Sequence, residues 1–120
     1  MQKYLTYAAF GWLTFSGTMH FLIDVAAQYL RHKRAPGPET TLYYGLNSAF
    51  ASGQVFFGLM CFWIAWRQPA FLGERPVAAV CLGAALSWLI ISFAFMEYWE
   101  PKMNAGIFAA LVVIAIIIRR

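Results

Sequence analysis

The sequence predicts an all-α protein, an integral membrane four-helix bundle with short loops and an up-down-up-down order of helices. Of its 120 residues, 62% are hydrophobic and only 12% are charged, whereas soluble domains average roughly 45–50% and about 25%. A soluble domain of this size cannot bury so much apolar surface. Four apolar segments near the length that a bilayer requires, about 20 residues, fill the chain. We therefore expect residues 1–120 to form a single transmembrane domain.

The first two predicted helices, residues 4–30 and 40–67, are joined by a basic and proline-rich connector. The run from Arg31 to Arg34 ends the first helix, and Pro36 and Pro38 prevent its continuation. An acid and two threonines after these prolines suit the first turn of a new helix. The short connector makes the two helices antiparallel neighbours.

The third and fourth predicted helices, residues 77–99 and 103–118, follow a second connector. Pro69 and Pro76 mark that connector, and Pro101 separates the last two helices. Small residues recur on helices two and three, where they let helices approach closely in lipid. These predicted packing positions are Gly45, Ala49, Gly53, Gly83 and Ser87.

Polar side chains are expected to gather at one depth of the bundle. If the N-terminus lies on side A of the membrane, His20 and Asp24 lie in the half of helix one near the opposite side, side B. These two residues share a helix face because they are four positions apart. Ionisable groups in hydrocarbon are costly and usually face the bundle interior. We therefore expect a polar pocket that is open to side B, closed toward side A, and lined by His20, Asp24, Asn47, Gln54 and Glu97.

Each polar feature has two interpretations. The Asp24 carboxylate orients the His20 ring and raises its basicity, as in a proton-handling pair, or the pair only joins helices by bonding to Asn47 and Gln54. Glu97 is either a second carboxylate of the pocket or a solvated interfacial acid. The tyrosines and tryptophans near side B form an aromatic belt or a box for a cationic ligand.

The residues predict no metal site and identify no cofactor. Ligands on one face of one helix do not complete a coordination sphere, and a haem held by two histidines needs a second chain because only His20 lies at depth. Cys61 and Cys81 stand in apolar segments without metal-ligand spacing. No basic patch interleaved with aromatics is present, so nucleic acid is not an expected partner.

The distribution of basic residues bears on the orientation of the chain in a membrane and on its resemblance to known proteins. Side A carries Lys3, Arg67, Arg75, Arg119 and Arg120 against four basic residues on side B, which favours cytoplasmic termini in a bacterial inner membrane. A nearly equal number of basic residues on the two sides is also typical of a chain that inserts in both directions. In length, helix count and the membrane-embedded Asp24 of helix one, the chain resembles the small multidrug exporters. The resemblance is architectural, and no residue role is taken from it.

Three functions follow as hypotheses. The leading one is a small multi-pass membrane protein whose pocket binds a lipid-like or small amphipathic ligand. The second is an accessory or scaffold subunit that docks its small-residue faces on another membrane protein or a second copy. The third is a proton-coupled small transporter. No nucleophile–base pattern is present, so an enzyme is not predicted.

Overall fold

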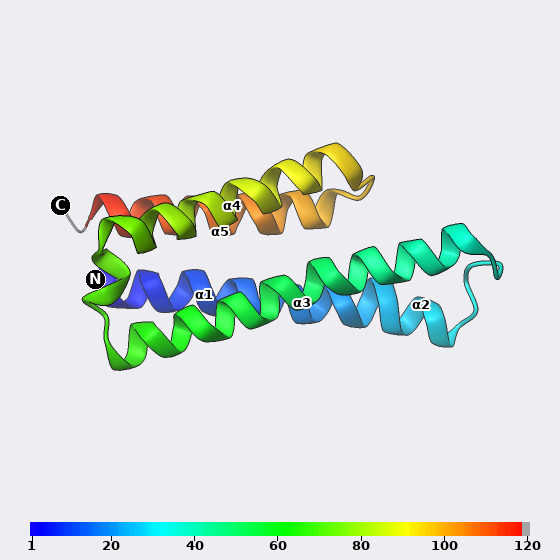
Figure 1. Ribbon diagram of the computed structural model, residues 1–120, viewed down its shortest axis with the longest axis horizontal. Helices are drawn as coiled ribbons and strands as arrows, with labels where there is room; N and C mark the ends of the chain where they lie inside the picture. The colour runs from blue at the N-terminus through cyan, green and yellow to red at the C-terminus, as the bar shows by residue number, and fades with distance from the viewer. Residues whose placement is uncertain (119–120) are drawn as a thin grey trace.

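The computed structural model describes residues 1–118 as four helices that alternate in direction (Figure 1). The all-α prediction is confirmed, and no strand occurs among these residues. Arg119 and Arg120, which enter the predicted charge balance, lie outside the described residues. The elements in order are α1 (Gln2–His20), the π-helical η1 (Phe21–Ala26), α2 (Ala27–Leu30), α3 (Pro38–Arg67), the 3₁₀ turn η2 (Phe71–Gly73), α4 (Arg75–Phe95) and α5 (Trp99–Ile117).

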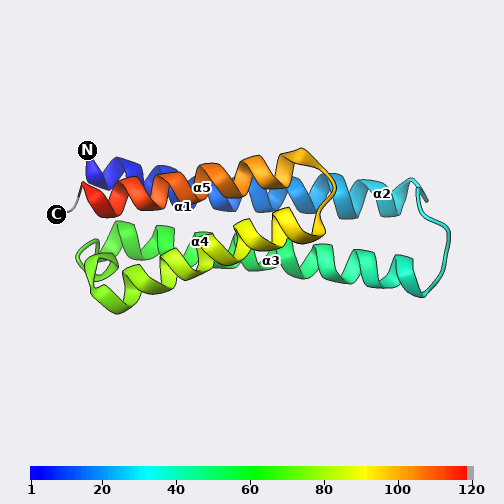
Figure 2. The same cartoon turned by 90° about the horizontal axis from the view of Figure 1, so that it is seen from above.

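The four helices form two antiparallel hairpins that lie side by side (Figures 1 and 2). The first hairpin pairs the continuous α1–η1–α2 helix with α3, and the second pairs α4 with α5. Helix α5 also packs along α1, which joins the hairpins on one side. On the other side, α3 and α4 make few close backbone contacts, and they meet through side chains such as Phe57 and Trp88.

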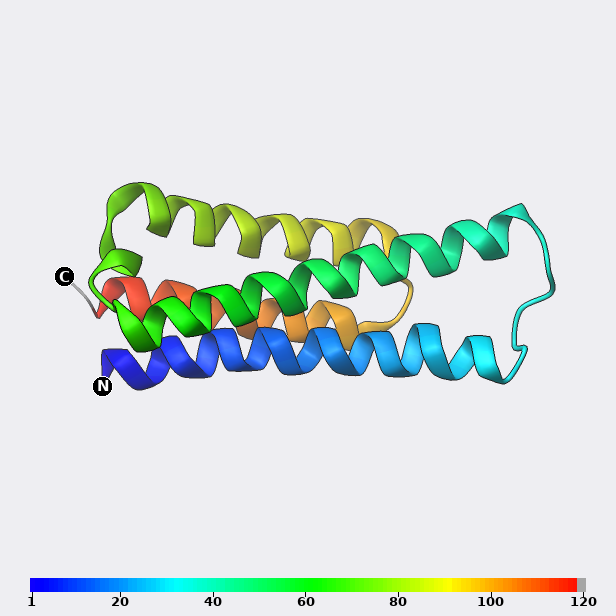
Figure 3. The same cartoon turned by 60° about the horizontal axis from the view of Figure 1, so that its bottom comes forward.

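The hairpins differ in length. Helix α3 has 30 residues, while α4 has 21 and α5 has 19. At 1.5 Å per residue, α3 is about 45 Å long and the second hairpin about 30 Å. The N-terminus and the end of α5 share one end of the bundle, which corresponds to side A (Figure 1). At side B the first hairpin therefore extends well beyond the second (Figure 3).

Two helix ends explain where the polar connectors lie. Helix α2 stops because His32 adopts a left-handed conformation with φ 49°, while the Lys33 N–H bonds back to the Gln28 carbonyl at 3.1 Å. Helix α4 ends at Phe95, so the predicted end at Trp99 is wrong. Trp99 instead begins α5, because Pro101 fits the first turn of a helix, where its missing N–H leaves no bond unmade.

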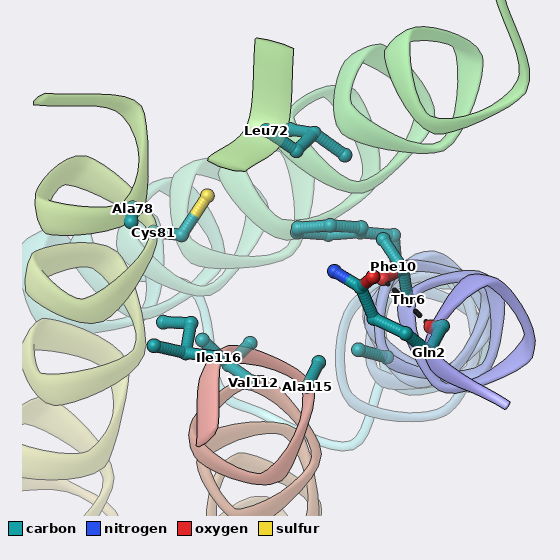
Figure 4. A pocket seen from close by; sticks show the side chains of 10 residues that line it. Gln2, Thr6, Phe10, Leu72, Ala78, Cys81, Val112, Ala115 and Ile116 are labelled. Atoms are coloured by element: carbon teal, nitrogen blue, oxygen red, sulfur yellow. Dashed lines mark hydrogen bonds between the residues drawn. The ribbon is translucent and has the colours of Figure 1, made fainter. Parts of the chain in front are cut away.

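The apolar core occupies the side-A half of the bundle. Buried residues from all four helices meet there, and Leu72 of η2 packs onto them from the end. A cavity of only about 30 Å³ remains among them (Figure 4), room for roughly one water molecule. Side A is thus closed by Phe10, Leu13, Cys61, Cys81, Ala85 and Phe108.

Helices α1 and α3 touch through Gly17 and Gly58, which the sequence did not single out. A Cβ on Gly17 would lie 2.8 Å from the Gln54 Cβ, and one on Gly58 would lie 3.0 Å from the Thr14 backbone nitrogen. Both distances are too short for a side chain, so glycine permits the contact.

The predicted packing positions behave differently. A Cβ on Gly45 or Gly83 would meet nothing within 4 Å, and one on Gly53 would meet only the Trp88 ring, at 3.8 Å. The close approach expected within the chain is therefore absent at Gly45 and Gly83, because these residues face outward. Docking of another chain by these faces stays a prediction.

By length and composition, three of the described helices could cross a membrane: α3, α4 and α5. The first predicted span, α1, is not among them, because six hydroxyl side chains together with Gln2, Lys3 and His20 lower its mean hydropathy.

Candidate functional site

The candidate site is built around His20, the last residue of α1. Its side chain is buried, with 8% of the residue exposed. The Nδ1 atom lies 2.9 Å from Asp24 Oδ2, and Nε2 lies 3.0 Å from Asn47 Oδ1 of α3. Phe50 closes the ring from the side, at 5.2 Å between ring centroids. His20 is therefore fixed at both nitrogens and on one edge.

Both nitrogens of His20 face oxygen acceptors. Asn47 donates its Nδ2 to the Tyr43 carbonyl at 2.9 Å, so its oxygen is the atom left to face the ring. An ionised Asp24 carboxylate can only accept. Nε2 therefore donates to Asn47 Oδ1, and the contact between Nδ1 and Asp24 holds a proton between the two side chains.

Asp24 lies inside the π-helical η1, which begins immediately after His20. A π-helical turn shifts its bonds from i+4 to i+5 and is found frequently at functional sites. Gln28 lies beyond this turn, in α2. Its side chain donates to the Tyr43 hydroxyl at 3.4 Å and accepts from Arg34 Nε at 3.3 Å.

Two cavities meet at His20. The larger, of about 800 Å³, opens between α3 and α4 at side B, where the two helices lack close contact. Its wall is apolar at Leu46, Phe50, Trp88, Ile91 and Phe95, and polar at His20, Arg34, Tyr43, Asn47, Glu97 and Tyr98.

The smaller cavity, of about 300 Å³, lies between the first helix and the start of α5. Asp24, Glu100 and Asn104 line it together with His20 and Tyr98. His20 therefore forms part of the wall between the two cavities. Among residues 1–118, no three His, Cys, Asp or Glu side chains are grouped as metal ligands.

The five predicted pocket residues are not all in one place. His20, Asp24 and Asn47 are joined by hydrogen bonds, and Glu97 lines the larger cavity with His20 and Asn47. Gln54 is buried, with 3% exposed, but it lies against Gly17 and outside both cavities. Gln54 is two helical turns from Asn47, about 10 Å closer to side A.

Sequence reasoning missed Arg34 and Trp88. Arg34 ends a basic run that is typical of the headgroup region, yet its guanidinium lies 3.4 Å from the centre of the Tyr43 ring and lines the larger cavity. Trp88 stands within an apolar helix and gave no signal, although its ring contacts Phe57 at 5.5 Å and lines the same cavity.

Comparison of the chain with models of protein families, with curated proteins and with solved structures finds no match.

Proposed function

We propose that this chain is an integral membrane protein of four spans whose larger cavity binds a lipid-like or small amphipathic ligand. The lengths of α4 and α5 match the ~30 Å hydrocarbon core of a bilayer. Large apolar side chains are exposed around the bundle, such as Phe56, Phe93 and Phe95 with 71%, 65% and 80% exposed. Contact of these side chains with lipid carries no free-energy penalty, whereas their contact with water does.

The observation that carries the ligand proposal is the composition of the larger cavity. Its volume of about 800 Å³ falls within the roughly 300–1,000 Å³ typical of ligand sites. One part of its wall is apolar, and the polar part includes a buried histidine held by Asp24 and Asn47. A long-chain amphiphile matches both parts, with its tail between α3 and α4 and its polar group near side B.

The depth of His20 in the bundle lowers the free-energy cost of placing ionisable side chains in a membrane. It shares the smaller cavity with Tyr98, Glu100 and Pro101, which lie where the second hairpin turns. If α4 and α5 span the hydrocarbon, His20 and Asp24 lie near the boundary with the headgroups. Charged groups there cost much less than at the bilayer centre.

Filling the cavity tests the proposal. Ala49 lines the larger cavity, and Ala94 is an exposed alanine on α4 that lines neither cavity at side B. We expect Ala49→Trp to abolish the lipid or amphiphile that purified protein retains in native mass spectrometry, and Ala94→Trp to leave it unchanged. Equal retention by the wild type and both variants would reject the cavity as the site.

Proton-coupled transport is a second candidate, favoured by the position of His20 between two cavities. Histidine is the side chain that ordinarily changes its charge between about pH 5 and 8. We expect ligand binding to change over this range in the wild type and to become flat in His20→Asn. Flat binding by the wild type between about pH 5 and 9 would exclude this role.

A further inference from the structure

The larger cavity presents one cation and one anion that do not pair with each other. Arg34 comes from the connector before α3, and Glu97 from the connector between α4 and α5. The only ion pair within residues 1–118 joins His20 and Asp24. Both Arg34 and Glu97 therefore face the cavity with charges that no protein group within that range neutralises.

Arg34 is prepared to bind an anion. Tyr43 supports one face of the guanidinium, with 3.4 Å between Cζ and the ring centre, and Gln28 accepts from Nε at 3.3 Å. Arginine has five N–H donors, so Arg34 retains donors on its terminal nitrogens beyond the bond from Nε to Gln28 and its interaction with the Tyr43 hydroxyl. A guanidinium held in this way suits the paired oxygens of a phosphate.

Glu97 supplies the opposite charge. It is exposed and stands beside Tyr98, whose ring lines the same cavity. A carboxylate next to an aromatic ring is a favourable environment for an ammonium group. Toward side A, the wall of the cavity becomes apolar through Phe50, Trp88 and Ile91.

We propose that the occupant of the larger cavity is a zwitterionic glycerophospholipid. Arg34 binds its phosphate, Glu97 and Tyr98 bind its ammonium group, and an acyl chain lies between α3 and α4. An anionic lipid would satisfy Arg34 but place a negative headgroup near Glu97. A cationic amphiphile would satisfy Glu97 but meet Arg34. Only the zwitterion matches both charges. This inference rests on the proposed function and specifies its ligand.

The test is competition between two lipids with the same acyl chains, phosphatidylethanolamine and phosphatidylglycerol, offered in equal amounts to delipidated protein. Native mass spectrometry gives the ratio of the two bound lipids. We expect the wild type to prefer the zwitterion about tenfold, which corresponds to one charge-assisted hydrogen bond. Glu97→Gln should bring the ratio near one, and Glu97→Lys should invert it.

Matched variants separate these contacts from general electrostatics. Arg34→Gln should weaken binding of both lipids about tenfold, while the neighbouring Lys33→Gln should not. Glu100→Gln makes the same charge change as Glu97→Gln in the smaller cavity and should leave the ratio unchanged. Equal effects of Glu97→Gln and Glu100→Gln would overturn the assignment.

The possible failures are distinguishable. A wild type that retains lipid without headgroup preference, or prefers the anionic lipid, overturns the inference and leaves the proposed function standing. A wild type that retains no lipid, whose retention is insensitive to Ala49→Trp, or that forms a dimer excluding lipid overturns the proposed function as well.

Discussion

At the scale of single residues, the central feature is a histidine whose two nitrogens both face acceptors. Asp24 supplies the acceptor on the Nδ1 side, and Asn47 supplies the one on the Nε2 side. Hydrogen bonds to charged groups contribute about 1.5–3 kcal/mol each. Removing the carboxylate charge therefore changes both the orientation of the ring and the charge of the cavity wall.

Asp24→Asn tests this residue directly. The amide offers a weaker acceptor to Nδ1 and can turn its NH₂ group toward the ring, so residue 24 no longer fixes the orientation of the His20 ring. We expect a changed profile of retained ligand in native mass spectrometry and a free energy of unfolding lower by about 1–3 kcal/mol. Glu74→Gln, near side A, serves as the control. An unchanged ligand profile in Asp24→Asn would remove the pair from the site.

His32 offers a test of the connector that carries Arg34. With φ 49° it occupies the left-handed conformation. Glycine usually holds this conformation at the residue that follows a helix. A residue with a Cβ pays about 1–2 kcal/mol there. We expect His32→Gly to raise the midpoint of thermal unfolding in detergent, whereas Lys33→Gly should not. A lower midpoint for His32→Gly would show that its side chain stabilises the connector.

At the scale of helices, the structure depends on the contact between α1 and α3. A Cβ at Gly58 would lie 3.1 Å from the Phe10 carbonyl oxygen and would also collide with the Thr14 hydroxyl. Backbone atoms on a packed helix cannot move aside locally, so the two helices would have to separate. Gly83 on α4 provides the opposite case, because a Cβ there meets nothing within 4 Å.

Gly58→Ala and Gly83→Ala form a matched pair. We expect Gly58→Ala to lower the free energy of unfolding by about 1–3 kcal/mol, as overpacking does. Gly83→Ala should be neutral or stabilise by up to about 1 kcal/mol through helix propensity. Unfolding of both variants in mixed detergent micelles measures the difference. Equal stability of the two would contradict the close approach of α1 and α3 at Gly58.

Local geometry explains which parts of the site could be predicted from the sequence. The His20–Asp24 contact follows from a spacing of four, and the tight first hairpin places Asn47 opposite. Gln54 shares the helix face of Asn47 but lies about two turns farther toward side A. Helical spacing shows which residues share a face, but not which of them line the same cavity. The π-helix and the stacking of Arg34 on Tyr43 depend on tertiary contacts, so composition and spacing carry no sign of them.

At the scale of the whole molecule, the helix lengths bear on where the site would lie in a bilayer. If the second hairpin, about 30 Å long, spans the hydrocarbon, the first hairpin, about 45 Å long, extends about 15 Å beyond it at side B. The sequence predicted four apolar segments of unequal length, and the second hairpin is shorter than the first in the structure as well, although α4 ends at Phe95 rather than Trp99. If the second hairpin spans the hydrocarbon, this difference in length places the open end of the larger cavity at the level of the lipid headgroups.

Labelling of single cysteines tests this placement. In protein with Cys61 and Cys81 replaced by alanine, a cysteine is introduced in place of Tyr29 near the tip of the first hairpin or in place of Phe56 within α3. The two positions are similarly exposed in the isolated chain, at 64% and 71%, so only a bilayer distinguishes them. We expect Tyr29→Cys to react with a membrane-impermeant maleimide in vesicles and Phe56→Cys to react only after denaturation. Reaction of Phe56→Cys in intact vesicles would reject the membrane span of α3.

The same variant tests the orientation. If the termini are cytoplasmic, Tyr29→Cys reacts in right-side-out vesicles without permeabilisation, and reaction only in inverted vesicles would reverse the orientation.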